Sequence, residues 1–213
     1  MTPIIISVAF DAADADGICA SQTPAGAGNL DVDGALATGG VATLCAAGLE
    51  RQVLVTTVAD ESGKTLTIYG TNATGNAISE SITGPNATTA ATTKFFRTVT
   101  RVAVSAAFAG AVTVGTNGVG SSRPLSLDYN KAEFVVTYAC DVSGTVNYDI
   151  EHTLDDLNNS ALAAPYWFDD TNLAGETTDQ FGNITYPVRF SRVKINSGTG
   201  TVRTVVIQAG GYS

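Results

Sequence analysis

Short runs of alternating apolar and polar residues recur along this chain, separated by clusters of Gly, Asn and Ser. Alternation with a period of two places successive side chains on opposite faces, as in a half-buried β-strand. No stretch shows the period of an amphipathic helix. The pattern therefore predicts an all-β fold of antiparallel strands in sandwiches, rather than alternating βαβ units. The expected strands are residues 64–72, 76–84, 101–107, 111–117, 133–139, 145–153, 187–195 and 201–210.

Two copies of an Asp-x-Ser-Gly motif suggest that the chain carries one β unit twice. The motif occurs at Asp60–Gly63 and again at Asp141–Gly144, each time after a Thr/Val-rich run. Asp and Gly at these places are typical of hairpin turns, in which Asp accepts backbone hydrogen bonds and Gly adopts a positive φ. Tandem duplication explains the repeat, and chance recurrence of short Thr/Val/Gly strings is the alternative. The other matched segments are 54–56 with 135–137, 101–104 with 192–195, and 110–112 with 200–202.

The alternation is interrupted between residues 119 and 130 by Gly, Ser and Pro124, which predicts a boundary near residue 122. We therefore expect two tandem antiparallel β-sandwich units, of jelly-roll or Ig-like type. The first would comprise residues 51–121 and the second residues 133–213, with a linker over residues 122–132.

The first 50 residues contain no basic residue and are rich in Gly and Ala. Because such a segment has little bulk for a core of its own, we expect an extended acidic arm over residues 1–50, or a segment that joins the first sandwich. Ile4, Ile5 and Ile6 permit two interpretations. They could add a strand to the sheet edge of a neighbouring molecule, or they could form the first strand of the first sandwich.

Composition excludes several classes of function. The chain has 20 acidic and 11 basic residues and a formal net charge of −9, so its surface should repel nucleic acid. No run approaches the length of a membrane span, and the start lacks the basic segment of a signal peptide. Cys19, Cys45 and Cys140 are odd in number and have no C-x-x-C spacing, which indicates small buried apolar residues rather than disulfides or a zinc site. No cofactor-binding motif is present.

Candidate catalytic groups are few. His152 is the single histidine and has no recognisable nucleophile motif near it, so we interpret it as a surface residue beside a turn. Asp155 and Asp156, together with Asp169 and Asp170, are the one set of acids that could supply the paired carboxylates of a glycoside hydrolase. We expect no catalytic residue, no cofactor and no metal.

Residues 155–183 form the least ordinary segment, because they are too many for a hairpin loop and include six acids without a base. Long loops of this kind are often functional. The segment contains Tyr166, Trp167 and Phe168, and Trp167 is the only tryptophan. These aromatic side chains could fold back over the sandwich as a plug, or they could anchor an interface between subunits.

Several strings, in this order, resemble a group of virion structural proteins of tailed bacteriophages. They are ADGICASQTPAGAGNLDVDG, GTNATGNAISESITGPNATT, VTVGTNG, VSGTVNYDIEHTLDD, YWFDD, FGN, YPVR and SGTGTV. The resemblance covers nearly the whole chain and brings no catalytic residues with it.

The resemblance implies a structural role in a phage particle, made in the cytoplasm of the host bacterium. The expected function is a capsid decoration or cement protein that binds the major capsid protein on the outer shell, and by analogy with that class a homotrimer. A tail, head-to-tail connector or fibre-base component is the alternative within the virion. A glycan-acting enzyme of a tail spike is the alternative from another class.

Overall fold

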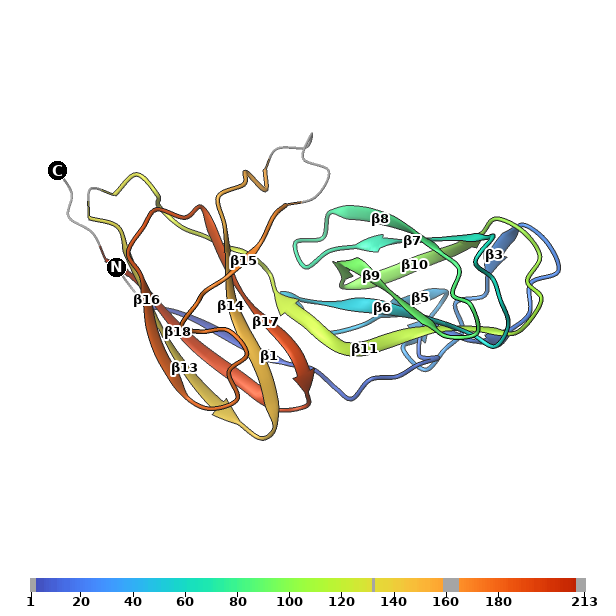
Figure 1. The fold of residues 1–213 in the computed structure, drawn as a ribbon, viewed down its shortest axis with the longest axis horizontal. Helices are drawn as coiled ribbons and strands as arrows, with labels where there is room; N and C mark the ends of the chain where they lie inside the picture. Colours follow the sequence, from blue (N-terminus) through green and yellow to red (C-terminus); the bar gives the residue numbers. More distant parts are fainter. Residues whose placement is uncertain (1–2, 132, 159–164, 210–213) are drawn as a thin grey trace. The chain divides into compact units, whose positions relative to one another are not determined.

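The computed structural model describes residues 3–131, 133–158 and 165–209, and within them all regular structure is β-strand (Figure 1). The all-β prediction is confirmed, and each expected strand overlaps a strand of the structure. The chain divides into two compact units: unit 1 comprises residues 1–10 and 121–213, and unit 2 comprises residues 11–120.

Each unit is built from its own β-strands. Unit 2 has β2 (Cys19–Gln22), β3 (Gly28–Leu30), β4 (Ala37–Thr38), β5 (Val41–Thr43), β6 (Leu49–Thr57), β7 (Thr65–Thr71), β8 (Ala77–Thr83), β9 (Thr89–Phe96), β10 (Thr98–Val104) and β11 (Val112–Ser122), whose last two residues belong to unit 1. Unit 1 has β1 (Ile4–Ala9), β12 (Leu125–Ser126), β13 (Val135–Ser143), β14 (Val146–Thr153), β15 (Phe168–Asp169), β16 (Gln180–Ile184), β17 (Phe190–Gly198) and β18 (Thr201–Ala209).

The two units pair their strands in the same order. In unit 1 one sheet runs β1-β18-β13-β16, and the other runs β12-β17-β14-β15. In unit 2 the corresponding sheets run β2-β11-β6-β9 and β3-β10-β7-β8, with β5 also paired to β10. When β4 and β5 of unit 2 are set aside, the described part of each unit has eight strands. The first pairs with the last, the second with the seventh, the third with the sixth and the fourth with the fifth, which is a long hairpin wrapped into a jelly roll. This agreement is what a duplication predicts, because the matched segments 54–56, 101–104 and 110–112 fall on strands equivalent to their partners.

The first Asp-x-Ser-Gly motif lies at the turn between β6 and β7. In the second, Asp141–Ser143 end strand β13 and only Gly144 lies in the turn to β14, and neither turn is a hairpin. β6 and β7 belong to different sheets of unit 2, and β13 and β14 belong to different sheets of unit 1. The hairpin prediction is therefore wrong, because the same turn chemistry serves a return within a sheet and a crossing between two sheets. The Asp prediction is confirmed at Asp60, whose Oδ1 accepts hydrogen bonds from Ser62 N at 3.0 Å and Ser62 Oγ at 2.6 Å.

The two motif glycines differ in backbone conformation, and this difference gives a prediction. Gly144 has a φ of 83°, whereas the φ of Gly63 lies outside the left-handed region. We expect Gly144→Ala to lower the free energy of unfolding by about 1–2 kcal/mol, because a Cβ is disfavoured there. Gly63→Ala is the matched control and should stay within about 0.5 kcal/mol of the wild type. Urea titration measures both, and equal losses would contradict the assignment.

Residues 11–50 contribute to the core of unit 2 and do not form an arm. Ile18, Leu30 and Leu44 are at most 4% exposed and belong to one apolar cluster with residues of β6, β7, β10 and β11. Of the two alternatives for this segment, the structure therefore agrees with the one in which it joins the first sandwich. The chain needs few large side chains here because the neighbouring strands supply the rest of the core.

The linker expected over residues 122–132 is also part of a unit. β12 pairs with β17, and Leu127 is 6% exposed. The boundary between the units falls between residues 120 and 121, close to the expected position. Cys19 and Cys140 are buried, and all three cysteines are free thiols. Burial raises the pKa of the Cys19 thiol to about 12, so this group stays protonated.

Strand β1 completes unit 1, the unit formed by the C-terminal half of the chain. It pairs with β18 in antiparallel register, Ile4 with Val206 and Val8 with Val202. Val8 is fully buried and Phe10 is 5% exposed, so the inward side chains of this segment are core residues. Neither sequence alternative is correct for Ile4, Ile5 and Ile6, because the strand adds to the second sandwich of its own chain. Unit 2 is thus inserted between the first and second strands of unit 1.

A buried acid fixes the turn between β6 and β7 in unit 2. The Glu61 side chain is fully buried and its Oε1 accepts hydrogen bonds from Ala109 N at 2.8 Å and Gly110 N at 3.0 Å. Its Oε2 forms an ion pair with Lys64. The carboxylate therefore ties the loop before β11 to the turn that crosses between the sheets.

Candidate interaction surface

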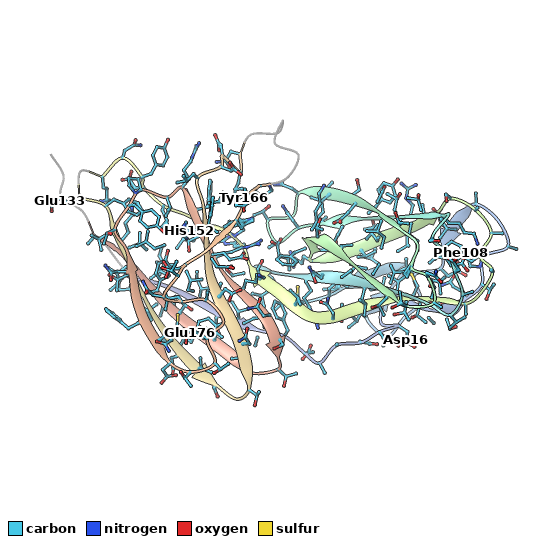
Figure 2. All side chains as sticks on the ribbon, in the orientation of Figure 1. Asp16, Phe108, Glu133, His152, Tyr166 and Glu176 are labelled. Atoms are coloured by element: carbon cyan, nitrogen blue, oxygen red, sulfur yellow. The ribbon has the colours of Figure 1, made fainter. Side chains whose placement is uncertain are left out.

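One end of unit 1, where Figure 2 labels Tyr166 and His152, carries exposed aromatic side chains and is called here the aromatic end. The exposed aromatic residues are Tyr129, Tyr166, Phe168 and Tyr186, of which Phe168 and Tyr186 contact the His152 ring. The register places Phe168 of β15 opposite His152 of β14. The Phe168 ring stacks on the imidazole at 5.9 Å between centroids, and Tyr166 meets Phe168 edge-on at 4.7 Å. The four aromatic side chains are 43%, 67%, 47% and 50% exposed, respectively. Their rings are held by one another, yet much of their apolar surface faces solvent.

His152 is a buried scaffold residue of this end, and its interpretation as a surface histidine is wrong. It is 6% exposed, and its Nε2 lies 3.0 Å from the Tyr186 hydroxyl. Burial lowers the pKa of His152, while the nearby Asp170 opposes that shift, so the ring is neutral at pH 7. A neutral imidazole hydrogen-bonded to Tyr186 and stacked on Phe168 fixes the positions of both rings.

Trp167 lies on the other face of the same sheet, above a ladder of charges. Its ring stacks on the Arg192 guanidinium at 4.1 Å, and Arg192 Nε donates to Glu151 Oε2 at 2.6 Å. Lys194 lies 3.0 Å from Glu151 and 3.3 Å from Asp149. Burial opposes the ammonium charge of Lys194, but the two carboxylates outweigh it and raise the pKa. Trp167 therefore covers ion pairs of its own unit, in agreement with the interpretation that the aromatic side chains fold back over the sandwich. Phe168 does not agree with it, because this side chain remains exposed.

Three acids in this ladder lie close enough to consider a metal. Oxygens of Asp149, Glu151 and Asp169 lie within 4.8 Å of one another. However, Asp149 also accepts from Gly175 N at 2.6 Å, and the basic side chains of the ladder already neutralise two of the three acids. Burial, and next the charge of Asp149, raise the pKa of Asp169. The basic partners of Asp149 and Glu151 would therefore compete with a cation at this cluster.

Three of the four carboxylates considered for glycoside hydrolysis, Asp155, Asp156 and Asp170, hold the loop in place. Asp155 Oδ2 accepts from Tyr166 N at 2.6 Å, and Asp156 forms an ion pair with Arg189 at 3.0 Å. Asp170 is buried and accepts from Asn172 N at 3.0 Å. An open hollow elsewhere in unit 1 contains one acid and no opposed pair; it is lined by Val142, Gly144, Thr177, Thr178 and Asp179.

The structure places both groups of candidate interface residues in unit 1, but on different sheets. Ile4, Ile5 and Ile6 lie on β1, whereas Tyr166, Trp167 and Phe168 lie at β15 or just before it. Sequence reasoning missed Tyr186 and Tyr129 as members of the aromatic end. Tyr129 joins it through Arg189, whose guanidinium lies 5.0 Å from the ring. Local sequence carries no signal for either residue, because both lie in loops between strands, after β12 and after β16.

Comparison with known proteins does not place the chain in a family. No family model and no curated protein matches the sequence. Among solved structures, the insecticidal crystal protein Cry7Ca1 of Bacillus thuringiensis aligns with a TM-score of 0.20 and 10% identity, over 78% of this chain and 42% of that one. A protein of Parabacteroides distasonis aligns with a TM-score of 0.24 and 11% identity, over 98% of this chain and 89% of that one. Likenesses this weak carry no argument about function.

In the described residues, no helix is long and apolar enough to cross a membrane.

Proposed function

We propose that this protein is a non-enzymatic structural component of a tailed-bacteriophage particle, and that it decorates or cements the outer shell. It would bind the major capsid protein through the aromatic end of unit 1. The observation that carries the proposal is the set of exposed rings on that end, Tyr166, Phe168 and Tyr186, held by the buried His152.

Rings of this kind suit a protein interface. Aromatic side chains lose little conformational entropy on binding, and pre-packed rings lose still less. Such residues dominate binding energy in many interfaces, where they lie at the centre of a desolvated patch. A protein partner therefore fits the aromatic end better than a small polar ligand does.

The virion assignment rests on the sequence resemblance to phage structural proteins, and two physical features support it. The net charge of −9 suits the outside of a shell, away from packaged DNA. Two jelly rolls with sheets rich in Thr and Val resist unfolding through ladder hydrogen bonds and close packing. Both features are compatible with a structural role that involves no catalysis.

Binding to shells tests the proposal. The double variant Tyr166→Ala, Phe168→Ala should weaken binding to purified shells that lack this protein by at least about tenfold, measured by co-sedimentation across a concentration series. The reason is that truncating a central interface residue typically costs more than 1 kcal/mol. The Trp167 fluorescence of the variant would check that unit 1 is still folded.

Val58→Ala is the matched control, because Val58 is 70% exposed and lies in unit 2. This variant should bind shells like the wild type. Unchanged binding by the double variant would place the attachment surface elsewhere. Failure of the wild type to bind shells, combined with binding to tails or connectors, would favour the alternative position in the particle. Copy number per particle separates the same two positions, since decoration requires hundreds of copies.

The enzyme alternative has a separate test. Asp169→Asn changes the one exposed residue among the four candidate acids, so folding should be preserved. Unchanged infectivity of particles that carry this variant, with no glycan cleavage by the wild type, is the result expected for a structural protein. Cleavage by the wild type that is lost in Asp169→Asn would overturn the non-enzymatic role.

A further inference from the structure

The outer face of the sheet β1-β18-β13-β16 carries a row of apolar side chains that crosses all four strands. The register aligns Ile5 with Val205, Val205 with Ala139, and Ala139 with Phe181. Phe181 is 71% exposed and Ile5 is 60% exposed, and Ile207 on the adjoining row is 41% exposed. The solvated face of an antiparallel sheet is normally polar. A continuous apolar row on it marks a surface that another molecule covers.

The row belongs to unit 1 and does not follow from the jelly-roll fold itself. The equivalent sheet of unit 2 is β2-β11-β6-β9. On those four strands, no described large apolar side chain is exposed as Ile5 and Phe181 are. The exposed large apolar residues of unit 2 are Val41 of β5 and Val58, which follows β6. Of the two units with equivalent strand order, unit 1 therefore carries the apolar outer face on this sheet.

Two opposite charges lie beside the apolar row. The next aligned row contains Ser7, Arg203 and Asp141, on β1, β18 and β13 respectively. Arg203 and Asp141 are exposed, and neither takes part in an ion pair with another described residue. The face thus offers one unpaired cation and one unpaired anion on its two central strands.

We propose that this face binds the same face of a second copy of the chain, about a two-fold axis that runs parallel to the strands between β18 and β13. The axis reverses the order of the strands in the partner. Ile5 then lies opposite the partner's Phe181, and Val205 lies opposite the partner's Ala139. The same operation sets Arg203 opposite the partner's Asp141, and by symmetry this pair forms twice. Large side chains meet at the edges of the interface, smaller ones meet at its centre, and both exposed charges gain a partner.

A two-fold pair accounts for this face better than the homotrimer expected from analogy. A three-fold axis would bring the face against a different surface of the neighbouring subunit, because three-fold contacts are heterologous. The self-complementary order of Ile5, Val205, Ala139 and Phe181 would then serve no purpose. The inference is independent of the proposed attachment through the aromatic end, which uses the other sheet of unit 1.

The size of the face sets the expected affinity. Four strands about 4.8 Å apart and about seven residues of about 3.3 Å each give a flat area of about 440 Å². Side chains that protrude enlarge the accessible area, but it stays at or below the roughly 800 Å² per partner of a standard stable interface. We therefore expect a dimer with a dissociation constant in the micromolar range, populated when the protein is concentrated.

Sedimentation equilibrium of the full chain over a concentration series tests the pairing. The wild type should change from 21.8 kDa to twice that mass as its concentration rises. Phe181→Glu should raise the dissociation constant at least about tenfold, because it places a charge in the apolar row. Val58→Glu adds the same charge at an equally exposed site in unit 2 and should leave the dimer unchanged.

A charge exchange tests the axis itself. Arg203→Asp alone and Asp141→Arg alone should each be monomeric, because each homodimer would oppose like charges twice. An equimolar mixture of these two variants should form a heterodimer, since every facing pair again has opposite charges. Thermal unfolding followed by Trp167 fluorescence would confirm that unit 1 of each variant is folded. A monomeric variant would then reflect the loss of the interface and not misfolding.

Each other result would overturn the inference. A wild type that stays monomeric at hundreds of micromolar has no such interface. A trimer would show that the face does not follow a two-fold axis. Dimerisation that survives Phe181→Glu would place the contact elsewhere, and a mixture of the charge variants that stays monomeric would show that Arg203 and Asp141 do not face each other.

Discussion

Replacing Glu61 with Ala is expected to lower the free energy of unfolding of unit 2 by about 2–4 kcal/mol. The substitution removes the acceptor of two backbone N–H groups, those of Ala109 and Gly110, and the ion-pair partner of Lys64. A buried donor left without an acceptor costs about 1–3 kcal/mol. Glu61 is fully buried, so water cannot easily replace the lost carboxylate. The loop before β11 should then detach from the turn between β6 and β7.

Differential scanning calorimetry measures the loss, with the transition of unit 1 identified by the fluorescence of its single tryptophan, Trp167. Glu61→Gln is the matched variant, because an amide oxygen can still accept both hydrogen bonds while the charge is lost. It should destabilise unit 2 less than Glu61→Ala does. If Glu61→Ala changed the unfolding free energy by under about 0.5 kcal/mol, the buried carboxylate would have no role in holding the turn.

The same residue should make unit 2 sensitive to acid. Burial acts to raise the pKa of Glu61, but the hydrogen bonds from Lys64, Gly110 and Ala109 outweigh it and hold the pKa below its ordinary value of 4.5. The stability that this shift contributes is present above that ordinary value and is lost as the pH falls through the lower folded-state pKa. Glu61→Gln should flatten this part of the profile, measured as melting temperature against pH.

Deleting residues 1–10 is the second change with a large expected effect, and it should unfold unit 1 while leaving unit 2 folded. Val8 and Phe10 are core residues, and each buried side chain of this kind contributes about 1.5–3 kcal/mol. The deletion also exposes β18 as a new sheet edge. Trp167 fluorescence should report an unfolded unit 1, while hydrogen exchange measured on peptides of residues 11–120 should remain protected.

Two point variants separate the role of the strand from the loss of chain length. Val8→Asp buries a charge and should reproduce much of the effect of the deletion, whereas Ser7→Asp places the same charge on the exposed face and should be tolerated. If the deletion left the Trp167 transition unchanged, β1 would be dispensable for unit 1. The strand would then be available to a neighbouring molecule, as one sequence interpretation proposed.

Local pattern located the strands β7, β8, β10, β11, β13, β14, β17 and β18, because alternation and turn residues are properties of short segments. Other strands, such as β9 and β16, were not predicted. The repeat could also be detected, since Arg101–Val104 and Arg192–Ile195 fall on the equivalent strands β10 and β17. Pairing between distant strands could not be predicted in the same way. An Ile-rich strand such as β1 fits any apolar sheet edge, and its actual partner, β18, is chosen by contacts across the whole chain.

The candidate surface was predictable only in part. Tyr166 and Phe168 were identified from an aromatic cluster in a long acidic loop, and both are exposed in the structure. The buried role of His152 could not be inferred, because it depends on the register that sets Phe168 opposite the ring. The apolar row was likewise hidden, since Ala139 and Phe181 are far apart in the sequence and meet only through strand pairing.

The insertion of unit 2 between β1 and the rest of unit 1 determines the order in which the protein can fold on the ribosome. Ile4 pairs with Val206, 202 positions later, so the first strand leaves the exit tunnel long before its partner is translated. Unit 2 can fold in the meantime, because all of its strands lie in one continuous segment. Until β18 appears, Ile4, Ile5 and Ile6 remain an unpaired apolar segment on a nascent chain, the kind of segment that chaperones bind. Slowing translation should therefore lower the soluble yield through unit 1 rather than through unit 2.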